Sequence, residues 1–431
     1  MEVGALFKIL LVFAGVLLLI RIKCPMGPAL VAGGLALGLW AGRPVMQVAA
    51  DLGYALRLPE LWLLLLIMAL VFEYGRYLAE ERNAQVIING ARAWGGRHGR
   101  AVSLMAMPAM IGLVPMPGGA VFSAPLVGQA VQGGDWDPVW KASVNYWFRH
   151  IWEYWWPMFP VVIVTLSIFD LSTVQFALLQ LPLSLAALGG GYLVFIRPHL
   201  EELAQPVEAG PPASRRGWKL ALPLAIVIAA SLWLPPVVGR MAPHWTGQTH
   251  KLVAMLVGLL AGLVPLLRDC GPGSRRRFVQ ALYEPKMLGL LVTVGGVIVF
   301  KALLERSGLL PLAGQDLVAS GVPILWVVAL LPLVAGLVTG IAIGFAAIAF
   351  PLLAGLAADP ATGLAPASTL VLGFAFGYAG MMCSPVHLCF ILSRGFFSAS
   401  LARMYKYIVP CSLFPLATAG LLYALLRAAG W

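Results

Sequence analysis

The sequence predicts an all-α, polytopic membrane protein built from two repeats of inverted topology. Of its 431 residues, 60% are hydrophobic and only 11% are charged, whereas about a quarter of the residues in a soluble domain are charged. Apolar runs of about 18 to 25 residues recur along the chain, each long enough to cross the hydrocarbon core as a helix. In addition, two apolar segments broken by proline and glycine occupy corresponding places in the two halves.

These two broken segments are IGLVPMPGGAVFSAPLVG, residues 111–128, and AGLVTGIAIGFAAIAFPLLAG, residues 335–355. Both open with Gly-Leu-Val, pass through a glycine-bearing middle, and close on Pro-Leu with a glycine soon after. We expect each to lie in a re-entrant helical hairpin, at about 101–132 and 325–356, because proline and glycine disfavour regular helix. Interrupted apolar segments at equivalent positions of two halves are typical of a transporter's binding site.

The first repeat is predicted to cover residues 1–196. Its transmembrane helices are expected at about 6–20, 25–40, 60–77, 139–169 and 174–196. The long aromatic element at 139–169 is expected to be broken near its middle. Short loops rich in arginine and lysine are placed on the cytoplasmic side, because positive residues in short loops orient membrane proteins.

A polar linker rich in proline and alanine, residues 197–217, separates the repeats on the cytoplasmic side, and the second repeat covers 218–431. Its transmembrane helices are expected at about 220–238, 252–267, 288–304, 368–392 and 408–426, with the helix at 368–392 broken. The prediction is thus about ten transmembrane helices and two hairpins. Five spans per half is an odd number, so the halves are inverted and both termini are expected outside.

The net charge of +11 does not indicate a nucleic-acid partner, because the basic residues gather in short loops and form no binding face. The five cysteines are scattered, without a disulfide framework or CxxC spacing. Cys383 and Cys389 flank His387, and thiolate with imidazole suits soft metals. Free cysteines in apolar surroundings usually act as small packing residues, so we predict neither a metal nor a cofactor.

Arg149, His150 and Glu153 form the densest ionisable cluster in any predicted span. Such residues are unfavourable in a membrane and by default mark a functional site. Arg149 and Glu153 are four residues apart, and His150 and Glu153 are three apart, so each pair can share a helical face. Two interpretations stay open: a role in binding a substrate or proton, or a structural ion pair with His150 bonded to a carbonyl.

The equivalent element of the second half contains GMMCSPVHLCF, in which Ser384-Pro385 interrupts the helix. Setting Phe-Arg-His-Ile of the first half against Pro-Val-His-Leu of the second places His150 and His387 at equivalent positions. A lone histidine in an apolar span is often only a packed side chain. Histidine also titrates near neutrality, so either of these two can carry a coupling proton.

The candidate substrate-binding residues come from the hairpin tips and the two breaks. They are Pro115, Pro117, Gly118, Gly119, Ser123, Asn145, Arg149, Thr339, Gly340, Gly344, Ser384 and Pro385. Broken-helix N-termini direct a positive dipole end into such a site, which favours an anion. We expect Arg149 to neutralise the substrate and His150, Glu153 or His387 to handle a proton.

The motifs VPMPGGAVFSAPLVG, NYWFRHIWEY and GMMCSPVHLCF resemble the ion-transporter superfamily, whose elevator-type carriers include gluconate, C4-dicarboxylate, citrate, lactate and arsenite permeases. Within it they look like a prokaryotic integral-membrane family. The resemblance implies a homodimer in a bacterial or archaeal cytoplasmic membrane, with a scaffold domain at the interface and a sliding transport domain. The Ser-Asn-Thr signatures of the divalent-anion branch are absent from both hairpin tips, so the resemblance does not decide between H⁺ and Na⁺ as coupling ion.

The prediction is therefore a secondary active transporter in the lipid bilayer that moves a small organic anion, with proton coupling, and not an enzyme. One alternative is a carrier for a cationic or amphiphilic solute that uses Glu153 and the surrounding aromatic residues. A second is an intramembrane enzyme that uses His150, Glu153 or Ser384, although the sequence contains no HExxH or GxSxG signature. A third is a channel, which would need one continuous pore.

Overall fold

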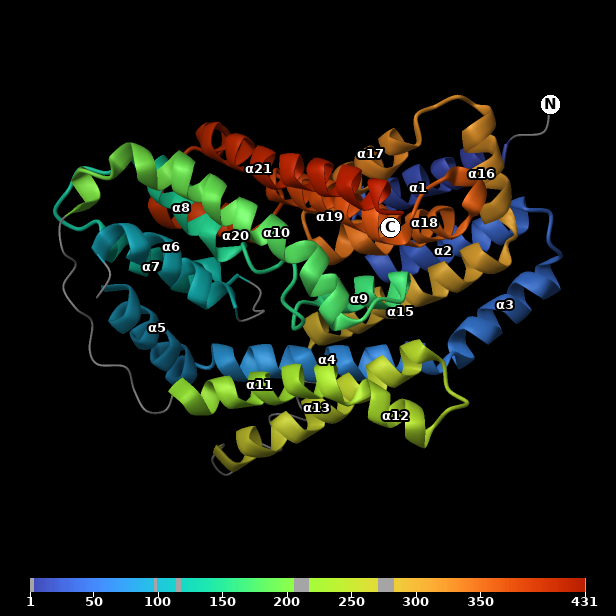
Figure 1. Cartoon of the computed structure of the whole chain (residues 1–431), viewed down its shortest axis with the longest axis horizontal. Helices are drawn as coiled ribbons and strands as arrows, with labels where there is room; N and C mark the ends of the chain where they lie inside the picture. The colour runs from blue at the N-terminus through green and yellow to red at the C-terminus, as the bar shows by residue number, and fades with distance from the viewer. Residues whose placement is uncertain (1–3, 97–98, 114–117, 205–216, 270–282, 431) are drawn as a thin grey trace.

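The structure, a computed structural model, describes residues 4–96, 99–113, 118–204, 217–269 and 283–430. Within these ranges the regular elements are all helices (Figure 1). Five of the described helices are long and apolar enough to cross a membrane, namely α4 (Pro59–Ala79), α10 (Thr173–Gly191), α13 (Gly247–Asp269), α15 (Pro285–Arg306) and α21 (Leu401–Ala428). A sixth is formed if α11 (Gly217–Trp233) and α12 (Pro235–Met241), bent by 54°, are one span. The prediction of a helical multi-pass membrane protein is confirmed.

The two elements expected to be broken each consist of two short helices joined by irregular backbone. In the first half these are α8 (Pro138–Arg149) and α9 (Pro160–Phe169). In the second half they are α19 (Pro366–Met382) and α20 (Leu388–Phe397). A proline lies within each interruption, where it removes a backbone donor from the helix (Pro157, Pro385).

Each hairpin packs against one part of both broken elements. The first hairpin, α6 (Gly99–Gly112) with α7 (Ala120–Ala130), contacts α8 and α20. The second, α17 (Ile324–Thr339) with α18 (Ala342–Ala358), contacts α19 and α9. Each hairpin therefore touches the first helix of the broken element that follows it and the second helix of the other. The two halves of the chain are interleaved through α9 and α20.

The N-terminal helices α1 (Ala5–Arg21) and α2 (Met26–Trp40) lie next to the second hairpin and α15 (Figure 1). Small residues allow α2 and α15 to approach closely, since a Cβ on Gly27 would collide with the backbone of Val292. The remaining elements are α3 (Val45–Arg57), α5 (Glu81–Gly96), α16 (Leu309–Ala319), the π-helix η1 (Tyr192–Ile196) and the 3₁₀ helices η2 (Arg197–His199), η3 (Glu202–Ala204) and η4 (Pro360–Thr362).

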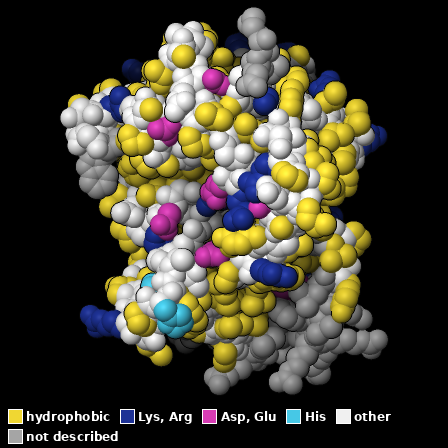
Figure 2. Space-filling model, turned by 90° about the vertical axis from the view of Figure 1, so that its right-hand side faces the viewer, with side chains coloured by type: hydrophobic (Ala, Val, Ile, Leu, Met, Phe, Trp, Pro, Cys, Tyr) yellow, Lys and Arg dark blue, Asp and Glu magenta, His cyan; other side chains and the backbone are white. Residues whose placement is uncertain are grey.

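The face of the molecule in Figure 2 is covered largely by hydrophobic side chains, and charged side chains gather in limited areas of it. Large apolar side chains on several long helices are more than half exposed, for example Leu18 of α1 (62%), Leu178 of α10 (68%) and Leu421 of α21 (62%). Soluble monomers rarely expose apolar patches on this scale. The surface therefore fits contact with lipid.

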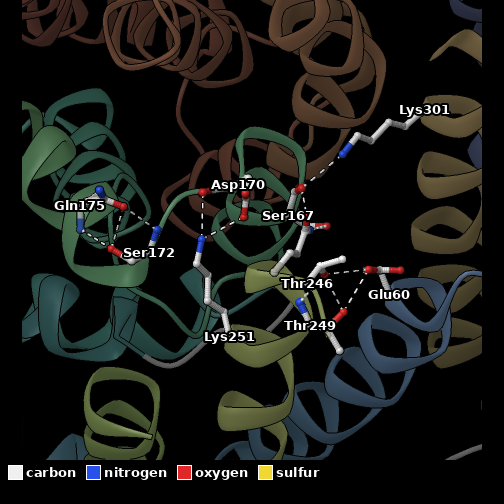
Figure 3. Close-up of polar contacts among 10 residues, drawn as sticks. Glu60, Ser167, Asp170, Ser172, Gln175, Thr246, Thr249, Lys251 and Lys301 are labelled. Carbon is white, nitrogen blue, oxygen red and sulfur yellow. Dashed lines mark hydrogen bonds and ion pairs between the residues drawn. The ribbon is translucent and has the colours of Figure 1, made fainter. Parts of the chain in front are cut away.

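A polar network joins the turn between α9 and α10 to α13 and α15 (Figure 3). Gln248 Nε2 donates to the carbonyl oxygen of Ser167 at 2.7 Å. Lys251 Nζ lies 2.9 Å from both the carbonyl oxygen and Oδ1 of Asp170. Lys301 Nζ of α15 reaches the Ser167 carbonyl at 3.4 Å. These contacts tie the end of the first broken element to the long helices beside α4.

Candidate functional site

A cavity of about 490 Å³, the central cavity, lies where the hairpins and the broken elements meet α4 and α15. Its walls come from segments far apart in the sequence, namely Val71, Phe72, Gly118, Arg149, His150, Glu153, residues 159–161, Lys286, Leu290, and residues 340–343 and 387–389. These segments include residues at or next to the N-termini of four helices, α7, α9, α18 and α20. Helix N-termini carry a partial positive charge that attracts anions.

Arg149, the last residue of α8, lies against the tip of the first hairpin with 2% of its surface exposed. A Cβ on Gly119 would collide with its guanidinium, and a Cβ on Gly112 would collide with its carbonyl group. Glycine at these two positions of the first hairpin is therefore required for the close approach of Arg149. The guanidinium is held where hairpin and broken element meet.

The second hairpin packs on the second break in a comparable way. Gly340 has a φ of +64°, a conformation that favours glycine. A Cβ there would lie 3.0 Å from both the His387 backbone nitrogen and Ser384 Oγ, closer than an ordinary contact. Ser384 Oγ in turn donates to the carbonyl oxygen of Leu337 at 2.7 Å. Ser384 thus fastens the break to the end of α17.

The imidazole rings of His150 and His387 lie next to each other in the wall of the central cavity. His150 Nδ1 lies 2.6 Å from the carbonyl oxygen of Tyr146, and His387 Nδ1 lies 2.6 Å from that of Gly340. A carbonyl oxygen only accepts hydrogen bonds, so each Nδ1 carries a hydrogen. The two Nε2 atoms lie 3.2 Å apart. Two neutral rings in these tautomers would present bare Nε2 atoms to each other, so a hydrogen bond between them requires one added proton.

Arg149, Glu153 and Cys389 surround this histidine pair. Arg149 Nη1 lies 3.4 Å from His150 Nε2 and 3.4 Å from Cys389 Sγ. Glu153 Oε1 lies 3.9 Å from Arg149 Nη1 and 3.8 Å from His150 Nε2. With both histidines neutral and Cys389 a thiol, the charges of Arg149 and Glu153 balance. One proton on the histidine pair makes the cluster singly positive.

The irregular backbone of the first break is covered by side chains from neighbouring helices. The Tyr378 hydroxyl of α19 donates to the His150 carbonyl at 2.7 Å, and Ser184 Oγ of α10 donates to the Ile151 carbonyl at 2.5 Å. Trp152 Nε1 donates to the carbonyl oxygen of Ala109 at 2.9 Å. Unwound backbone at membrane depth is tolerated only where protein or a wet cavity satisfies it. The two hydroxyl groups satisfy carbonyl groups of the break, and the Trp152 side chain attaches the break to α6.

His150, His387 and Cys389 also place two imidazole nitrogens and a thiol within 4.8 Å of one another. Zinc and copper take such donors. The Arg149 guanidinium is 3.4 Å from two of the three donor atoms, and its positive charge would repel a metal cation at that position. The arrangement therefore favours a proton over a metal ion among these groups.

Six of the residues singled out from the sequence line the central cavity, namely Gly118, Arg149, His150, Glu153, Gly340 and His387. Asn145 does not line it and instead ties α8 to its neighbours. Its Nδ2 donates to the Ala120 carbonyl at 3.0 Å and to Ser393 Oγ at 2.9 Å. Pro115 and Pro117 lie outside the described residues.

The other candidates act within the hairpins or at the surface. Ser123 Oγ lies 3.4 Å from the Ala120 carbonyl of its own helix, and Thr339 Oγ1 donates to the Ala335 carbonyl at 2.7 Å. A Cβ on Gly344 would collide with Thr339, so this glycine permits the tight turn of the second hairpin. Pro385 is exposed and does not line the central cavity.

Several cavity residues were not predicted from the sequence. Val71 and Phe72 of α4 and Lys286 and Leu290 of α15 also line the central cavity. Val71, Phe72 and Leu290 sit in ordinary apolar runs, so no local pattern distinguishes them from residues that face lipid. Lys286 follows a proline at the start of a span, where a lysine is also expected at the membrane interface.

The fold is similar to that of a solved membrane protein. The crystal structure of the Alcanivorax borkumensis YdaH transporter, described as having an unusual topology, matches with a TM-score of 0.51. The match covers 89% of this chain and 87% of that chain at 16% sequence identity. At this identity the similarity shows a shared fold. A search of curated proteins gives no significant sequence match.

The sequence also matches a protein family described as "Protein of unknown function (DUF401)", over residues 87–213 and 250–426. These two segments contain both hairpins, both broken elements and every cavity residue except those contributed by α4. Together they make up more than half of the chain. The chain belongs to this DUF401 family.

Proposed function

We propose that the protein is a secondary active transporter that moves a small organic anion across the cytoplasmic membrane. One observation carries the proposal: both hairpins and both breaks, from opposite ends of the chain, contribute to a single cavity that holds Arg149. Discontinuous helices around a central site are the usual construction of secondary transporters. The shared fold with a protein described as a transporter supports the same conclusion.

The interleaved packing of the hairpins supports two inverted repeats. Each hairpin makes the same pair of contacts with the broken elements, as two structurally equivalent halves would. The ten spans of this proposal are the five long helices, the bent pair α11–α12, the shorter helices α1 and α2, and the two broken elements. The boundaries at residues 196 and 218 and the external position of both termini belong to this proposal.

An anion is favoured over a cation by the charges around the central cavity. Four helix N-termini border it, and each contributes partial positive charge. A cation carrier would depend on Glu153. This carboxylate lies 3.9 Å from the Arg149 guanidinium, which already balances its negative charge. The added proton of the histidine pair would then leave one net positive charge for the solute.

Coupling to a proton follows from the same charge balance. The anion binds to a singly positive cluster when His150 and His387 share a proton, and to a neutral cluster when they do not. The proton therefore raises the affinity for the solute, and the bound solute raises the affinity for the proton by the same factor, because coupling between two binding sites is reciprocal. The coupled species is one proton with one negative charge on the solute.

An elevator movement would carry the hairpins and broken elements past α4, α13 and α15. The central cavity lies at this boundary, because α4 and α15 supply its remaining wall. The polar network of Figure 3 joins the same two parts through Gln248, Lys251 and Lys301. The Lys251–Asp170 ion pair of this network is exposed, and exposed ion pairs are weak enough to break during a transport cycle. A homodimer built on the static part completes the proposal.

The test is transport in proteoliposomes that contain the full chain and a trapped pH-sensitive dye. A panel of organic anions, organic cations and sodium salts is added outside. We expect proton movement when particular anions are added, and its loss in Arg149→Gln. Arg403→Gln is the matched control, because Arg403 is 69% exposed at its side chain and pairs with Asp137 away from the cavity.

Three results would overturn the proposal. Transport of cations alone, with dependence on Glu153, would favour the cation carrier. Passive ion conductance without saturation would favour a channel. Normal anion transport by Arg149→Gln would remove the arginine from the substrate site and leave it as the partner of a structural ion pair.

A further inference from the structure

The walls of the central cavity are chemically divided. The titratable groups Arg149, His150, Glu153, His387 and Cys389 form one cluster, in which each group lies within 3.9 Å of another. The rest of the wall is mainly apolar, supplied by Val71, Phe72, Phe159, Pro160, Val161, Leu290, Ile341, Ala342, Ile343 and Leu388. A ligand that fills this space meets charge at one place and hydrocarbon elsewhere.

From this division, and resting on the proposed anion transport, we propose that the substrate is an amphiphilic monoanion: one carboxylate-type head on an apolar body. The head pairs with Arg149 and the body lies against the residues from α4, α9, α15 and α18. A cavity of about 490 Å³ is in the range that holds drug-sized ligands with mostly apolar walls. A very small acid would leave most of the apolar wall in contact with water.

A dicarboxylate or sugar acid fits this cavity poorly. Its second carboxylate or its hydroxyls would face apolar side chains, and polar groups buried without a partner are strongly disfavoured. Outside the cluster, Lys286 is the other cationic residue among the described residues that line the central cavity. It is solvent-exposed at the first turn of α15, so the test includes a variant of it.

The affinity should grow with the apolar length of the ligand. Burial of one methylene group contributes enough free energy for roughly a fourfold tighter binding. The binding affinity should therefore increase in even steps from butyrate to hexanoate to octanoate, until the apolar chain of the ligand fills the cavity. Octanol, which lacks the charge, and succinate, which lacks the apolar body, should bind far more weakly than octanoate.

The experiment measures the displacement of labelled octanoate from the full chain in lipid nanodiscs. The signal from empty nanodiscs is subtracted, because it reports the octanoate that partitions into lipid. Leu290→Trp places a larger side chain in the cavity wall and should weaken the binding of octanoate more than the binding of butyrate. Leu288→Trp is the matched control, since Leu288 is on the same helix, is 46% exposed and does not line the cavity. Arg149→Gln should abolish binding of the whole series.

The outcomes separate this inference from the proposed function. Tighter binding of succinate than of butyrate, lost in Arg149→Gln or Lys286→Ala, would overturn the monoanion while leaving anion transport intact. Equal effects of the two tryptophan variants would also overturn it. Absence of any Arg149-dependent anion binding would overturn both proposals, as would binding of octylamine that depends on Glu153.

Discussion

Replacement of Gly119 by alanine tests the position of Arg149 without changing any charge. Gly119 has a helical backbone conformation, so alanine causes no backbone strain there. Its Cβ would lie 2.8 Å from Arg149 Nε, where ordinary contacts begin at 3.4 Å, so the guanidinium must withdraw by at least about 0.6 Å. A hydrogen bond to a charged group contributes about 1.5–3 kcal/mol, so loss of one bond to the solute raises its dissociation constant roughly 10- to 150-fold.

Gly128→Ala is the matched control for this substitution. Gly128 lies in the same helix, and a Cβ there would meet its nearest atom, on Phe397, at 3.9 Å, an ordinary contact. The measurement is isothermal titration of a transported anion into purified protein, with thermal unfolding to compare stability. We expect weak binding with normal folding for Gly119→Ala and near-normal binding for Gly128→Ala. Equal affinities of the two variants would refute the role given to Arg149.

Three further predictions concern the proton, the polar network and the break. The wild type should bind the anion more tightly as pH falls, because a proton on the histidine pair adds positive charge. His150→Gln or His387→Gln should flatten this pH profile, and an unchanged profile would contradict the shared proton. Lys251→Ala should raise the rate of backbone hydrogen exchange at the Asp170 turn by up to about fivefold, since an exposed ion pair contributes at most about 1 kcal/mol. An unchanged exchange rate would show that the Lys251–Asp170 pair does not stabilise this turn. Tyr378→Phe should destabilise the fold by about 1 kcal/mol through the lost bond to the His150 carbonyl, and an unaltered unfolding midpoint would argue against that bond.

The helical, multi-pass fold was accessible from the sequence because hydropathy and length determine it directly. The interruption at Ser384-Pro385 was expected because proline removes a backbone donor and restricts the residue before it, and a break near the middle of residues 139–169 was expected as well. The short helices α3 and α16 were not predicted. They have 13 and 11 residues, too few to span a membrane, and lie beside longer apolar runs.

Some of the residues proposed from the sequence line the central cavity and others do not, and the packing of each side chain explains the difference. Arg149, His150, Glu153 and His387 stand out because ionisable residues are rare inside apolar spans. Asn145 stands out because polar side chains are also uncommon inside apolar spans, yet it holds α7 and α20 against α8. Polarity in a span reveals that a residue has a partner, but only the packing shows whether that partner is a ligand or the protein.

The relation between the two breaks bears on how many charges the site can accept. The predicted alignment of the two halves sets His150 against His387, and each Nδ1 lies 2.6 Å from a backbone carbonyl oxygen. The residue before His150 is Arg149, whereas the residue before His387 is Val386, 57% exposed. The histidine is therefore duplicated and the arginine is not. A site with two such arginines would suit a dianion, whereas one arginine and one shared proton beside Glu153 leave a single positive charge, which is the charge that one monoanion neutralises.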